Sequence, residues 1–533
     1  MSHASRGRIS VIVVALDAPV DLVRASVDSI RDQTANDWEL CVVTGPTGVA
    51  PLRAAVDIGG LDKRISLRAL TQPEGDAAAF ADAVASTSAE FVTWLDAGDL
   101  LEPVALERVL ASTAEDADFV YTDEDQLDSA GRANIRLKPD WSPDRLRAYP
   151  YTGRLAVFRR TALDDAGGIR PELALASDHD VSLRVGERAR RIVHVAEVLY
   201  HQRSRDVGTT SGPASSATLR AVAEHLERVG FPATVEPDRE KPHLLRFRPA
   251  LTTQPPVSIV IPTGGHRRVV HGRLLNLVAN CVASVVRRST YPDYEILCVV
   301  DESTDKAAVD ELVAAGGDKL RIILYRQQFN FARKINVGAL HAQSDFLVFL
   351  NDDTEVISPD WIESLLMFAS DPTVGAVGAK LRFADRRLQH VGTIAVGGNV
   401  GHQYYGFPAD FDGHMDNART PTNCIAVTAA CLMTRRDCFE TVGGLSLQFP
   451  LNYNDIDYGL KLYRSGYRNV FNPYAELYHF ETSSRASGSV SAVELEALRE
   501  RWGSVLRRDP YYNPGFGGLS DFVLPLSVSA AAG

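Results

Sequence analysis

Two halves of the chain repeat one set of sequence blocks in the same order. "ISVIVVALDAPV" at residue 9 matches "VSIVIPTGGHRR" at residue 257, and "DWELCVVTG" at residue 37 matches "DYEILCVVD" at residue 293. "AEFVTWLDAGDLLEPVALE" at residue 89 matches "SDFLVFLNDDTEVISPDWIE" at residue 344. "SDHDVSLRVGERARRIVHVAEVLYH" at residue 177 matches "NDIDYGLKLYRSGYRNVFNPYAELYH" at residue 454. Because four blocks agree in order, we expect an internal duplication with two domains of the same fold.

Both halves alternate short strand patterns with helical patterns, which is typical of βαβ units and a mostly parallel sheet. The 533 residues also exceed what one hydrophobic core usually supports. An amphipathic helix at 215–230 ends at Gly230, and the Pro-containing stretch 231–256 then reads as a linker or short edge strand. We expect an N-terminal α/β domain over 1–250 that includes this helix, a C-terminal α/β domain over 251–515, and a tail over 516–533.

Composition restricts the class of protein. The formal net charge of −12 argues against a general nucleic-acid binder, because phosphate contacts need a basic surface. The sequence has no apolar run of about 18 residues, and its N-terminus lacks the apolar stretch of a signal peptide. We therefore expect a cytoplasmic protein, free or peripheral at the inner face of the plasma membrane. The six cysteines form no C-x-x-C pair, which favours reduced, buried thiols.

In the second half, a hydrophobic run ends abruptly in Asn351, Asp352 and Asp353, within "FVFLNDDTEVISPDWIE". The run predicts a strand buried on both faces, and Ser358 with Pro359 predicts the start of the next helix. Two adjacent carboxylates repel each other unless a cation or a proton lies between them. Their expected place, at the carboxyl edge of an open α/β sheet, is where ligands bind.

Other polar groups follow the ends of neighbouring predicted strands. "VIPT" ends one strand at Pro262 and Thr263, and "CVVDESTD" ends the next at Asp301. In "NDIDYGLKLYRSGY", Asp455 and Asp457 open an amphipathic helix. A carboxylate at a helix N-terminus is stabilised by the helix dipole, so Asp455 should stay ionised and available as a base.

A metal site is a further expectation. Asp353 and His479, which follows the short strand in "ELYHFETSSR", could ligate a divalent cation whose other ligands are phosphate oxygens and water. Mg²⁺ is often held in this way, and an imidazole ligand favours Mn²⁺. Each residue alone also has an ordinary explanation, such as a solvated turn or a core histidine, so the joint arrangement carries the prediction. The irregular segment 381–430, rich in Gly, His and Asn, predicts a functional loop.

The second half resembles a family 2 glycosyltransferase with the GT-A fold. The resemblance lies in "VSIVIPT", "VVDESTD", "NFARKINVGAL", "FLNDDTEVISPDWIE", "AVTAACLMTRRDCFETVGG", "NDIDYGLKLYRSGY" and "AELYHFETSSR". The whole chain is similar to tandem-domain members associated with bacterial O-antigen, rhamnan and cell-wall polysaccharide synthesis. This resemblance implies an inverting transfer of a sugar from a nucleotide-diphosphate donor, such as a dTDP- or UDP-sugar, to a hydroxyl of a glycan or lipid-linked glycan.

The resemblance also implies residue roles. Asp455 would be the catalytic base, and Asp353 and His479 would bind Mn²⁺ or Mg²⁺. Nucleotide and diphosphate contacts would come from Pro262, Thr263, Asp301, Arg333, Lys334, Asn336, Asn351 and Asp352. Contacts to the donor sugar or acceptor would come from Thr428, Ala429, Ala430, Cys431, Asn454 and Asp457. Asn351 departs from the leading Asp of the D-x-D-like motif, although Asn is common in this subgroup.

The first half departs further from the pattern. Gly45 stands opposite Asp301, and Gly98 stands opposite Asp353 if the leucines before each motif are aligned. A second site survives in part through Asp96, Asp99, Asp178 and His201. We expect a degenerate first domain that packs against the second and holds acceptor polymer. The rival hypothesis is a bifunctional enzyme in which Asp96 or Asp99 binds metal and Asp178 is a second base.

Two segments of the sequence each allow two interpretations, and a third segment bears on the class of enzyme. "TDEDQLD" at 122–128 is either a solvated turn or a contact for hydroxyls or metal. The helix at 492–508 carries Leu498 and Trp502 on one face, which predicts packing on its own domain or, less simply, docking on a membrane or partner. "PTGGHRRVVHGR" partly matches the phosphate loop of sugar nucleotidyltransferases, a second enzyme class. A non-catalytic glycan-binding scaffold is a third class, and it would suit the first half alone.

Overall fold

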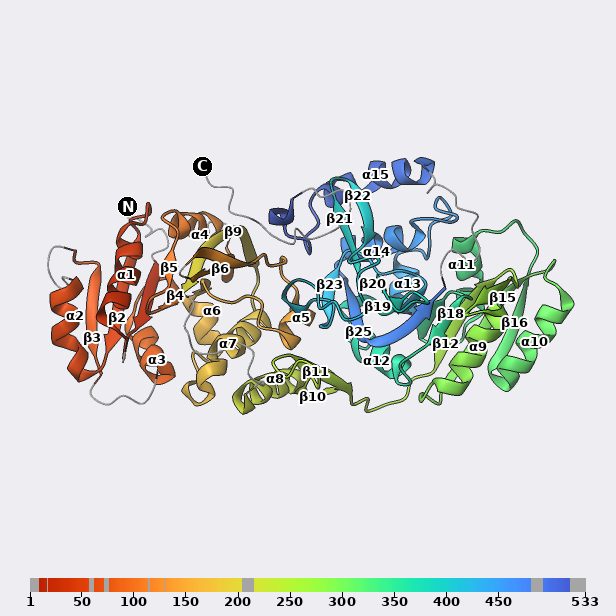
Figure 1. Cartoon of the computed structure of the whole chain (residues 1–533), viewed down its shortest axis with the longest axis horizontal. Helices are drawn as coiled ribbons and strands as arrows, with labels where there is room; N and C mark the ends of the chain where they lie inside the picture. Colours follow the sequence, from red (N-terminus) through yellow and green to blue (C-terminus); the bar gives the residue numbers. More distant parts are fainter. Residues whose placement is uncertain are drawn as a thin grey trace.

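The computed structural model of the chain describes residues 9–16, 18–56, 62–70, 76–113, 116–128, 130–203, 215–480 and 492–517. Figure 1 shows an elongated molecule in which the first half of the chain, coloured red to yellow, lies beside the second half, coloured green to blue. Each half contains a central sheet with helices packed against it (Figure 1).

The first half forms one sheet and the helices around it. Its strands are β1 (Ile9–Val14), β2 (Trp38–Thr44), β3 (Ile65–Ala69), β4 (Phe91–Asp96), β5 (Leu100–Leu101), β6 (Phe119–Asp128), β7 (Gly131–Arg136), β8 (Ala156–Arg159) and β9 (Ile192–Arg203). Its helices are α1 (Val20–Arg31), α2 (Val49–Val56), α3 (Asp76–Ser86), α4 (Ala105–Thr113), α5 (Pro143–Ala148), α6 (Arg160–Asp165) and α7 (Ser177–Gly186).

The second half repeats this plan with additions. The strands of its main sheet are β12 (Val257–Thr263), β15 (Tyr294–Asp301), β16 (Leu320–Tyr325), β17 (Phe346–Leu350), β18 (Thr354–Val356), β19 (Val374–Arg382), β20 (Leu388–His390), β23 (Thr422–Cys424), β24 (Cys431–Arg435) and β25 (Arg468–His479). Two hairpins stand apart, β13 (Arg267–Val270) with β14 (Arg273–Asn276) and β21 (Thr393–Val396) with β22 (Asn399–His402). The helices are α9 (Leu277–Arg288), α10 (Lys306–Gly316), α11 (Phe331–His341), α12 (Trp361–Ala369), α13 (Arg436–Thr441), α14 (Asn454–Arg464) and α15 (Ala492–Arg507).

The two main sheets have the same strand order, which confirms the duplication. The first is ordered β3-β2-β1-β4-β8-β6-β9-β5 and the second β16-β15-β12-β17-β24-β19-β25-β18. In both, the first four strands are parallel and the fifth is antiparallel. In the second sheet, β12 is buried at every position, and β17, for which the sequence predicts burial on both faces, is buried at every position after Phe346. The α/β class with mostly parallel central sheets is therefore confirmed.

The connection between the halves is more ordered than a simple linker. Helix α8 (Ser216–Arg228) starts where the sequence predicts, because the Ser215 hydroxyl accepts a hydrogen bond from the Thr218 amide and caps the helix. The following stretch forms an antiparallel hairpin of β10 (Ala233–Pro237) and β11 (Leu245–Pro249) rather than one edge strand. The rings of Phe231 and Phe368 lie 5.2 Å apart, so this connection packs against the second half.

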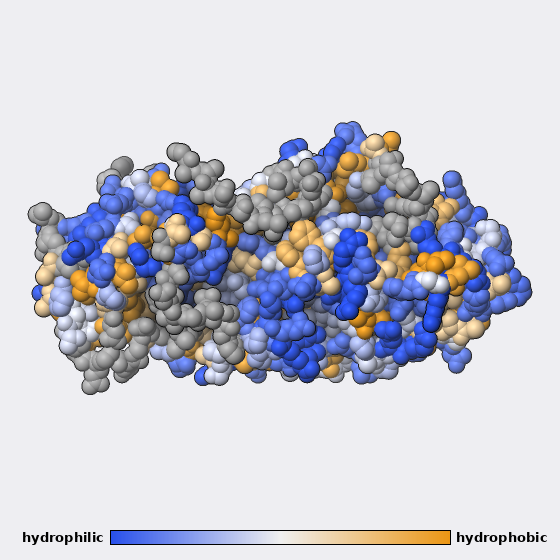
Figure 2. Space-filling model, viewed as in Figure 1, coloured by the Kyte–Doolittle hydropathy of each residue, from blue (hydrophilic) through white to orange (hydrophobic). Residues whose placement is uncertain are grey.

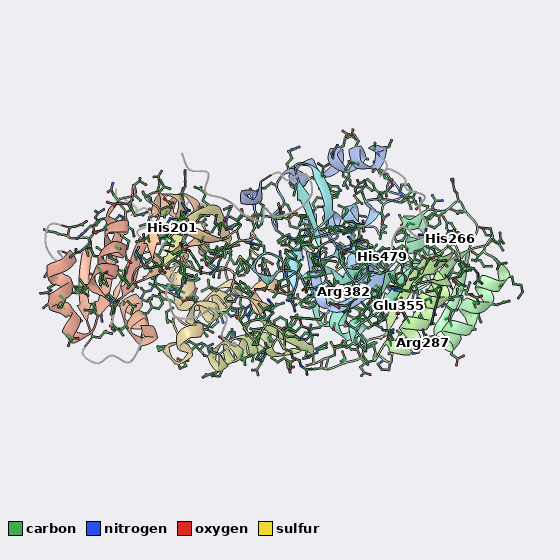
Figure 3. The ribbon with its side chains drawn as sticks, viewed as in Figure 1. His201, His266, Arg287, Glu355, Arg382 and His479 are labelled. Atoms are coloured by element: carbon green, nitrogen blue, oxygen red, sulfur yellow. The ribbon has the colours of Figure 1, made fainter. Side chains whose placement is uncertain are left out.

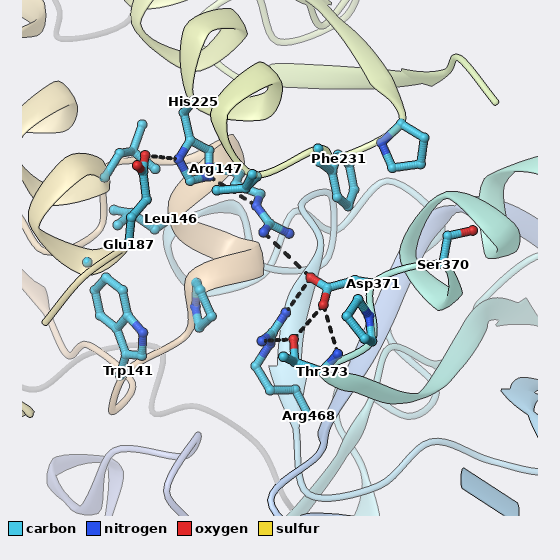
Figure 4. A pocket seen from close by; sticks show the side chains of 17 residues that line it. Trp141, Leu146, Arg147, Glu187, His225, Phe231, Ser370, Asp371, Thr373 and Arg468 are labelled. Carbon is cyan, nitrogen blue, oxygen red and sulfur yellow. Dashed lines mark hydrogen bonds and ion pairs between the residues drawn. The ribbon is translucent and has the colours of Figure 1, made fainter. Parts of the chain in front are cut away.

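Direct polar contacts also join the halves. The Ser142 hydroxyl donates to Asn423 Oδ1 at 2.9 Å, and Arg468 forms a 3.0 Å ion pair with the fully buried Asp144. Figure 4 shows a neighbouring pocket of about 390 Å³ between the halves, in which Arg147 and Arg468 both approach Asp371. Asn423 belongs to the irregular segment 381–430, so part of that segment serves the interface.

The chain after α15 crosses back to the first half. Asn513 Nδ2 donates to Asp123 Oδ2 at 2.8 Å. Leu498 and Trp502 are buried, which confirms that the terminal helix packs on its own domain. Of the expected tail, residues 518–533 lie outside the described residues, as do residues 481–485 of the motif that follows His479.

The acidic stretch 122–128 is neither a solvated turn nor an open ligand site. It lies in β6, where Asp123, Glu124 and Asp125 are buried. Glu124 pairs with the buried Lys138 at 2.9 Å, and Asp125 pairs with His201 at 2.6 Å. The protein itself therefore supplies the partners of these carboxylates, with Arg132 as a second partner of Asp125, as buried charges require.

The sequence predicts reduced cysteines and no membrane-spanning helix. The described cysteines are all free, and only Cys41 among them is partly exposed. Within the described residues, no helix combines the length and the apolar surface needed to cross a bilayer.

Candidate active site

The predicted cluster forms at the carboxyl edge of the second sheet. Strand β12 ends at Thr263, β17 is followed by residues 351–353, and β25 ends at His479, which Figure 3 labels. Strand β18 pairs with β25 in a register that sets Thr354 opposite His479. This pairing brings the acidic loop and the histidine together although 125 or more residues separate them in the chain.

The loop and His479 bring together side chains of the kinds that ligate divalent cations. His479 Nε2 lies 3.1 Å from Asp353 Oδ1 and 3.1 Å from Asn351 Nδ2. His479 Nδ1 lies 2.8 Å from Gln389 Oε1, an acceptor, so in the neutral ring the proton belongs on Nδ1 and the lone pair on Nε2. Asn351 Oδ1 is buried without a hydrogen-bond partner among the described residues. An unprotonated imidazole nitrogen beside a carboxylate oxygen and an unpartnered amide oxygen suits a divalent cation.

The same residues do not complete a metal site alone. Among the described residues, no three His, Cys, Asp or Glu side chains are grouped to hold a metal ion. A cation held by Asp353 and His479 would need further ligands, and phosphate oxygens and water as those ligands stay a prediction.

Asp352 contacts the end of strand β12. Its Oδ2 accepts a 2.6 Å hydrogen bond from the Thr263 hydroxyl. Desolvation, followed by the charge of Asp353, raises the pKa of Asp352 to about 7. The two adjacent carboxylates therefore repel as the sequence predicts, and a cation beside them would relieve the repulsion.

Asp455 lies at the start of α14, as expected, and is coupled to the acidic loop by a short bridge. Its Oδ2 accepts a hydrogen bond from the Ala429 amide at 3.2 Å. The next residue, Ala430, accepts a 3.0 Å hydrogen bond from the Asn351 amide through its carbonyl. Adjacent residues of one segment thus hold the candidate base on one side and the candidate metal loop on the other.

Three of the residues expected to contact the donor have hydrogen-bond partners within the protein. Lys334 is fully buried, pairs with Asp301 at 2.6 Å and donates to the Thr263 carbonyl, so it braces the strand ends instead of facing solvent. Asn336 uses both ends of its amide on the Leu445 backbone. Arg333 bonds Gln327. Sequence spacing on α11 could not distinguish these internal contacts from contacts to a ligand.

Asp457 also has partners within the protein. Its Oδ1 accepts from Trp502 Nε1 at 2.9 Å and lies 3.2 Å from Arg501, both on α15. Residues two apart on a helix point to different faces, which separates Asp457 from Asp455. Asn454 and Cys431 are buried where their elements begin. Asp457 is fully buried against α15, and its contact with a sugar stays a prediction.

Two residues of β20 support the site and were missed. Gln389 holds His479 at both its ring nitrogen and its carbonyl oxygen. His390 Nε2 accepts a 3.4 Å hydrogen bond from the Thr428 amide, while its Nδ1 meets His402 Nδ1 at 2.7 Å. Burial lowers the pKa of His390 well below its usual value, so it stays neutral. The only sequence signal was the richness of segment 381–430 in polar residues.

The comparison with known proteins decides the family. The model of glycosyl transferase family 2 matches residues 10–166 and 258–443, one segment in each half.

The chain belongs to glycosyl transferase family 2.

Relatives extend across almost the whole chain. The uncharacterized protein y4gI of Sinorhizobium fredii is 32% identical over 97% of this chain and 58% of its own length. The O-antigen biosynthesis protein RfbC of Myxococcus xanthus is 33% identical over 96% of this chain and 40% of its own length. The chain thus spans about half the length of these curated relatives. Among solved structures, S. aureus TarS 1-349 aligns at 17% identity over 41% of this chain and 65% of that chain, with a TM-score of 0.33.

The first family 2 domain holds an arginine where the second has a small residue. Arg159 pairs with Phe91 in the first sheet as Arg435 pairs with Phe346 in the second, so Arg154 takes the position of Ala430. Its guanidinium lies 2.8 Å from Asp96 and 2.7 Å from Asp178. Asp96 and Asp178 are therefore paired with a cation of the protein itself.

Sheet register also corrects the alignment of Gly98 with Asp353. Leu100 lies opposite His201 as Thr354 lies opposite His479, so Asp99 is the equivalent of Asp353 and Gly98 is part of a longer loop. Asp99 is buried, accepts from the Tyr200 hydroxyl at 2.5 Å and from the Arg203 amide, and burial raises its pKa to about 6.

His201, the equivalent of His479, contacts carboxylates other than Asp99. Its Nδ1 lies 2.6 Å from Asp125 and its Nε2 lies 3.1 Å from Glu102. The first domain thus keeps the residue types of a site but not the contacts that join them in the second domain.

Proposed function

We propose that the second domain transfers a sugar from a nucleoside-diphosphate sugar to a hydroxyl, with inversion at the anomeric carbon. The observation that carries the proposal is the bridge at residues 429–430, which links Asp455 to the loop that holds Asp353 and faces His479. An inverting displacement needs a base on one face of the sugar and charge relief at the leaving group on the other. Family membership supports the sugar-transfer class.

In the proposed reaction, the Asp455 carboxylate takes the proton of the acceptor hydroxyl. The hydroxyl oxygen forms a bond to the anomeric carbon as the bond from that carbon to the diphosphate oxygen breaks. The electron pair of the broken bond leaves with the nucleoside diphosphate. The half-buried position of Asp455 beside the Ala429 amide holds the carboxylate in place for this proton transfer.

We propose that Asp353 and His479 hold Mn²⁺ or Mg²⁺, with Asn351 Oδ1 as a further oxygen near the ion. A divalent cation would supply charge neutralisation at the diphosphate leaving group. Gln389 fixes the His479 ring so that Nε2 faces the carboxylate.

For the substrate class, we propose a bacterial surface or cell-wall glycan as the acceptor and a dTDP- or UDP-sugar as the donor. The 33% identity to an O-antigen biosynthesis protein supports the acceptor class. A sugar nucleotidyltransferase loses its support, because the segment that resembled its phosphate loop forms the hairpin β13–β14. We propose that the first domain is degenerate, since Arg154 occupies the space between Asp96 and Asp178.

The test compares two matched aspartates. Asp455→Asn should bind donor normally and lower kcat by about 10²–10⁴-fold, because the amide cannot accept the proton. Asp178→Asn, at the equivalent position of the first domain, is the control and should leave transfer unchanged. Release of nucleoside diphosphate in the presence of acceptor measures the rate, and calorimetry measures donor binding. Wild-type transfer by Asp455→Asn would refute the base assignment, and loss of transfer in Asp178→Asn would show that both domains act.

A further inference from the structure

The hairpin β13–β14 is a small two-stranded sheet that stands apart from the main sheet. Val269 lies directly opposite Leu274, and each is 65% exposed. Its two-residue turn, His271-Gly272, has positive φ at both positions, which is typical of a tight type I′ hairpin. The hairpin therefore presents an aliphatic pair to the outside on a rigid support.

The opposite face of the hairpin anchors it beside the candidate active site. Val270 packs with Leu277 and Phe480 in one buried cluster, and Phe480 directly follows His479. At its other end the hairpin is joined through residues 264–266 to Thr263, the hydroxyl partner of Asp352. The exposed pair is thus fixed relative to the site by packing on one side and by a short connection on the other.

The hairpin itself is basic in a chain that is acidic overall. Residues 266–276 contain three arginines, two histidines and no Asp or Glu, whereas the whole chain has a formal net charge of −12. Arg267 pairs with Glu311, but within the described part of the chain no ion pair engages Arg268 or the exposed Arg273. Figure 2 shows hydrophobic side chains between hydrophilic ones at the end of the molecule where Figure 3 labels His266.

We propose that the β13–β14 hairpin docks on an anionic phospholipid surface. Arginines near such a surface are attracted to its negative potential, and aliphatic side chains gain by entering the interface. An acidic soluble glycan would attract the arginines electrostatically, but it would leave Val269 and Leu274 exposed to water. A bilayer surface uses both features at once. The terminal helix α15 does not compete for this role, since its apolar face is buried.

Docking here would bring the site edge to the membrane. The partner that we propose is a bilayer rich in acidic headgroups. Binding to this bilayer does not depend on the sugar-transfer reaction. The purpose of such binding, which is to reach a lipid-linked acceptor, rests on the proposed function.

The experiment is sedimentation of the full chain with vesicles of phosphatidylcholine containing phosphatidylglycerol, and with vesicles of phosphatidylcholine alone. We expect binding to the acidic vesicles that falls with added salt, and none to the neutral ones. Val269→Asp/Leu274→Asp should abolish sedimentation, and Arg268→Gln and Arg273→Gln should each weaken it about fivefold. Leu340→Asp, at a residue 83% exposed on α11, is the matched control and should sediment like wild type.

Two further readouts make the outcome decisive. Because none of the substituted side chains is buried, calorimetric donor binding should be unchanged in every variant. A failure of docking is therefore separable from a failure of the proposed function. Equal sedimentation of Val269→Asp/Leu274→Asp and wild type would overturn the proposal. A dimer in solution that the double variant breaks, without vesicle binding, would replace it with contact between two copies. Binding of a soluble acidic glycan in place of vesicles would replace it with an acceptor site.

Discussion

At the scale of single residues, the orientation of His479 decides what its ring can bind. The hydrogen bond to Gln389 keeps the proton on Nδ1 and leaves Nε2 facing Asp353. Partners of this kind typically change metal affinity about 10–100-fold. Gln389 is therefore a positioning residue that acts through the histidine.

Gln389→Leu should weaken Mn²⁺ binding about 10–100-fold in the presence of nucleoside diphosphate, because the ring loses its fixed tautomer and orientation. Electron paramagnetic resonance of free Mn²⁺ measures the affinity, and ¹⁵N chemical shifts of His479 report the tautomer. Gln389→Glu keeps an acceptor oxygen and should restore much of the affinity. The exposed Gln343→Leu serves as control. Unchanged Mn²⁺ affinity in Gln389→Leu would show that the contact is only structural.

Arg154 permits a second prediction at this scale. Desolvation raises the pKa of Asp178, and the nearby Arg154 is the main opposing influence. Without the guanidinium, the pKa of Asp178 should rise further, so the folded state holds its proton over a wider pH range than the unfolded state. The variant then loses stability as pH rises.

Arg154→Ala should therefore be destabilised by about 2 kcal/mol at pH 7 and by less near pH 5, after allowance for the partial exposure of the pair. Urea denaturation at both pH values measures the difference. Arg154→Ala/Asp178→Asn should recover most of the stability, since it removes the unpaired carboxylate. A deficit in Arg154→Ala that stays the same from pH 5 to pH 7 would contradict this account of the pair.

At the scale of elements, the buried Asp509 side chain attaches the segment after α15 to strand β21 through a hydrogen bond. Asp509 is 2% exposed and accepts hydrogen bonds from the Ala395 amide of β21 and from the Tyr511 amide. Desolvation still raises the pKa of Asp509 to about 7. The folded state therefore binds this proton more tightly than the unfolded state, and its contribution to stability is lost as pH rises from about 4 towards 7.

Asp509→Asn should remove this dependence. Relative to wild type, the variant should gain stability as the pH is raised from 5 to 8, by about 2 kcal/mol over that range. Thermal or urea unfolding of both proteins at the two pH values measures the change in their difference. Asp28→Asn, in a surface pair with Arg31, is a suitable control. If the difference between Asp509→Asn and wild type did not change with pH, the titration would belong to another group.

At the scale of the whole molecule, repeated blocks were enough to predict two sheets, because strand order follows from the order of matched strand and helix patterns. The site residues that end strands or open helices, Asp353, Asp455 and His479, were predictable for the same reason. Gln389 was not, since its partner lies 90 residues away and no spacing rule joins them. Likewise, the pairing of Asp144 with Arg468 crosses 324 residues, so the domain interface could not be predicted from sequence.

Sequence shows residue type and not direction. Asp457 carries the expected charge, but the helix turns it towards Trp502. Gly98 appeared to replace Asp353 because a leucine alignment cannot detect one additional loop residue, whereas the pairing of Leu100 with His201 reveals it. The sequence of the acidic stretch 122–128 gave no sign that Lys138 and Arg132 would pair with its carboxylates.

The central claim is that one domain of the two binds the donor and does so with a metal. Calorimetric titration of a panel of nucleotide sugars, with and without Mn²⁺, on wild type, Asp353→Ala and Asp178→Asn tests it most directly. We predict one Mn²⁺-dependent site for one donor, absent in Asp353→Ala and unchanged in Asp178→Asn. Two donor sites, or a single site that survives Asp353→Ala, would contradict the assignment of the donor site to the second domain.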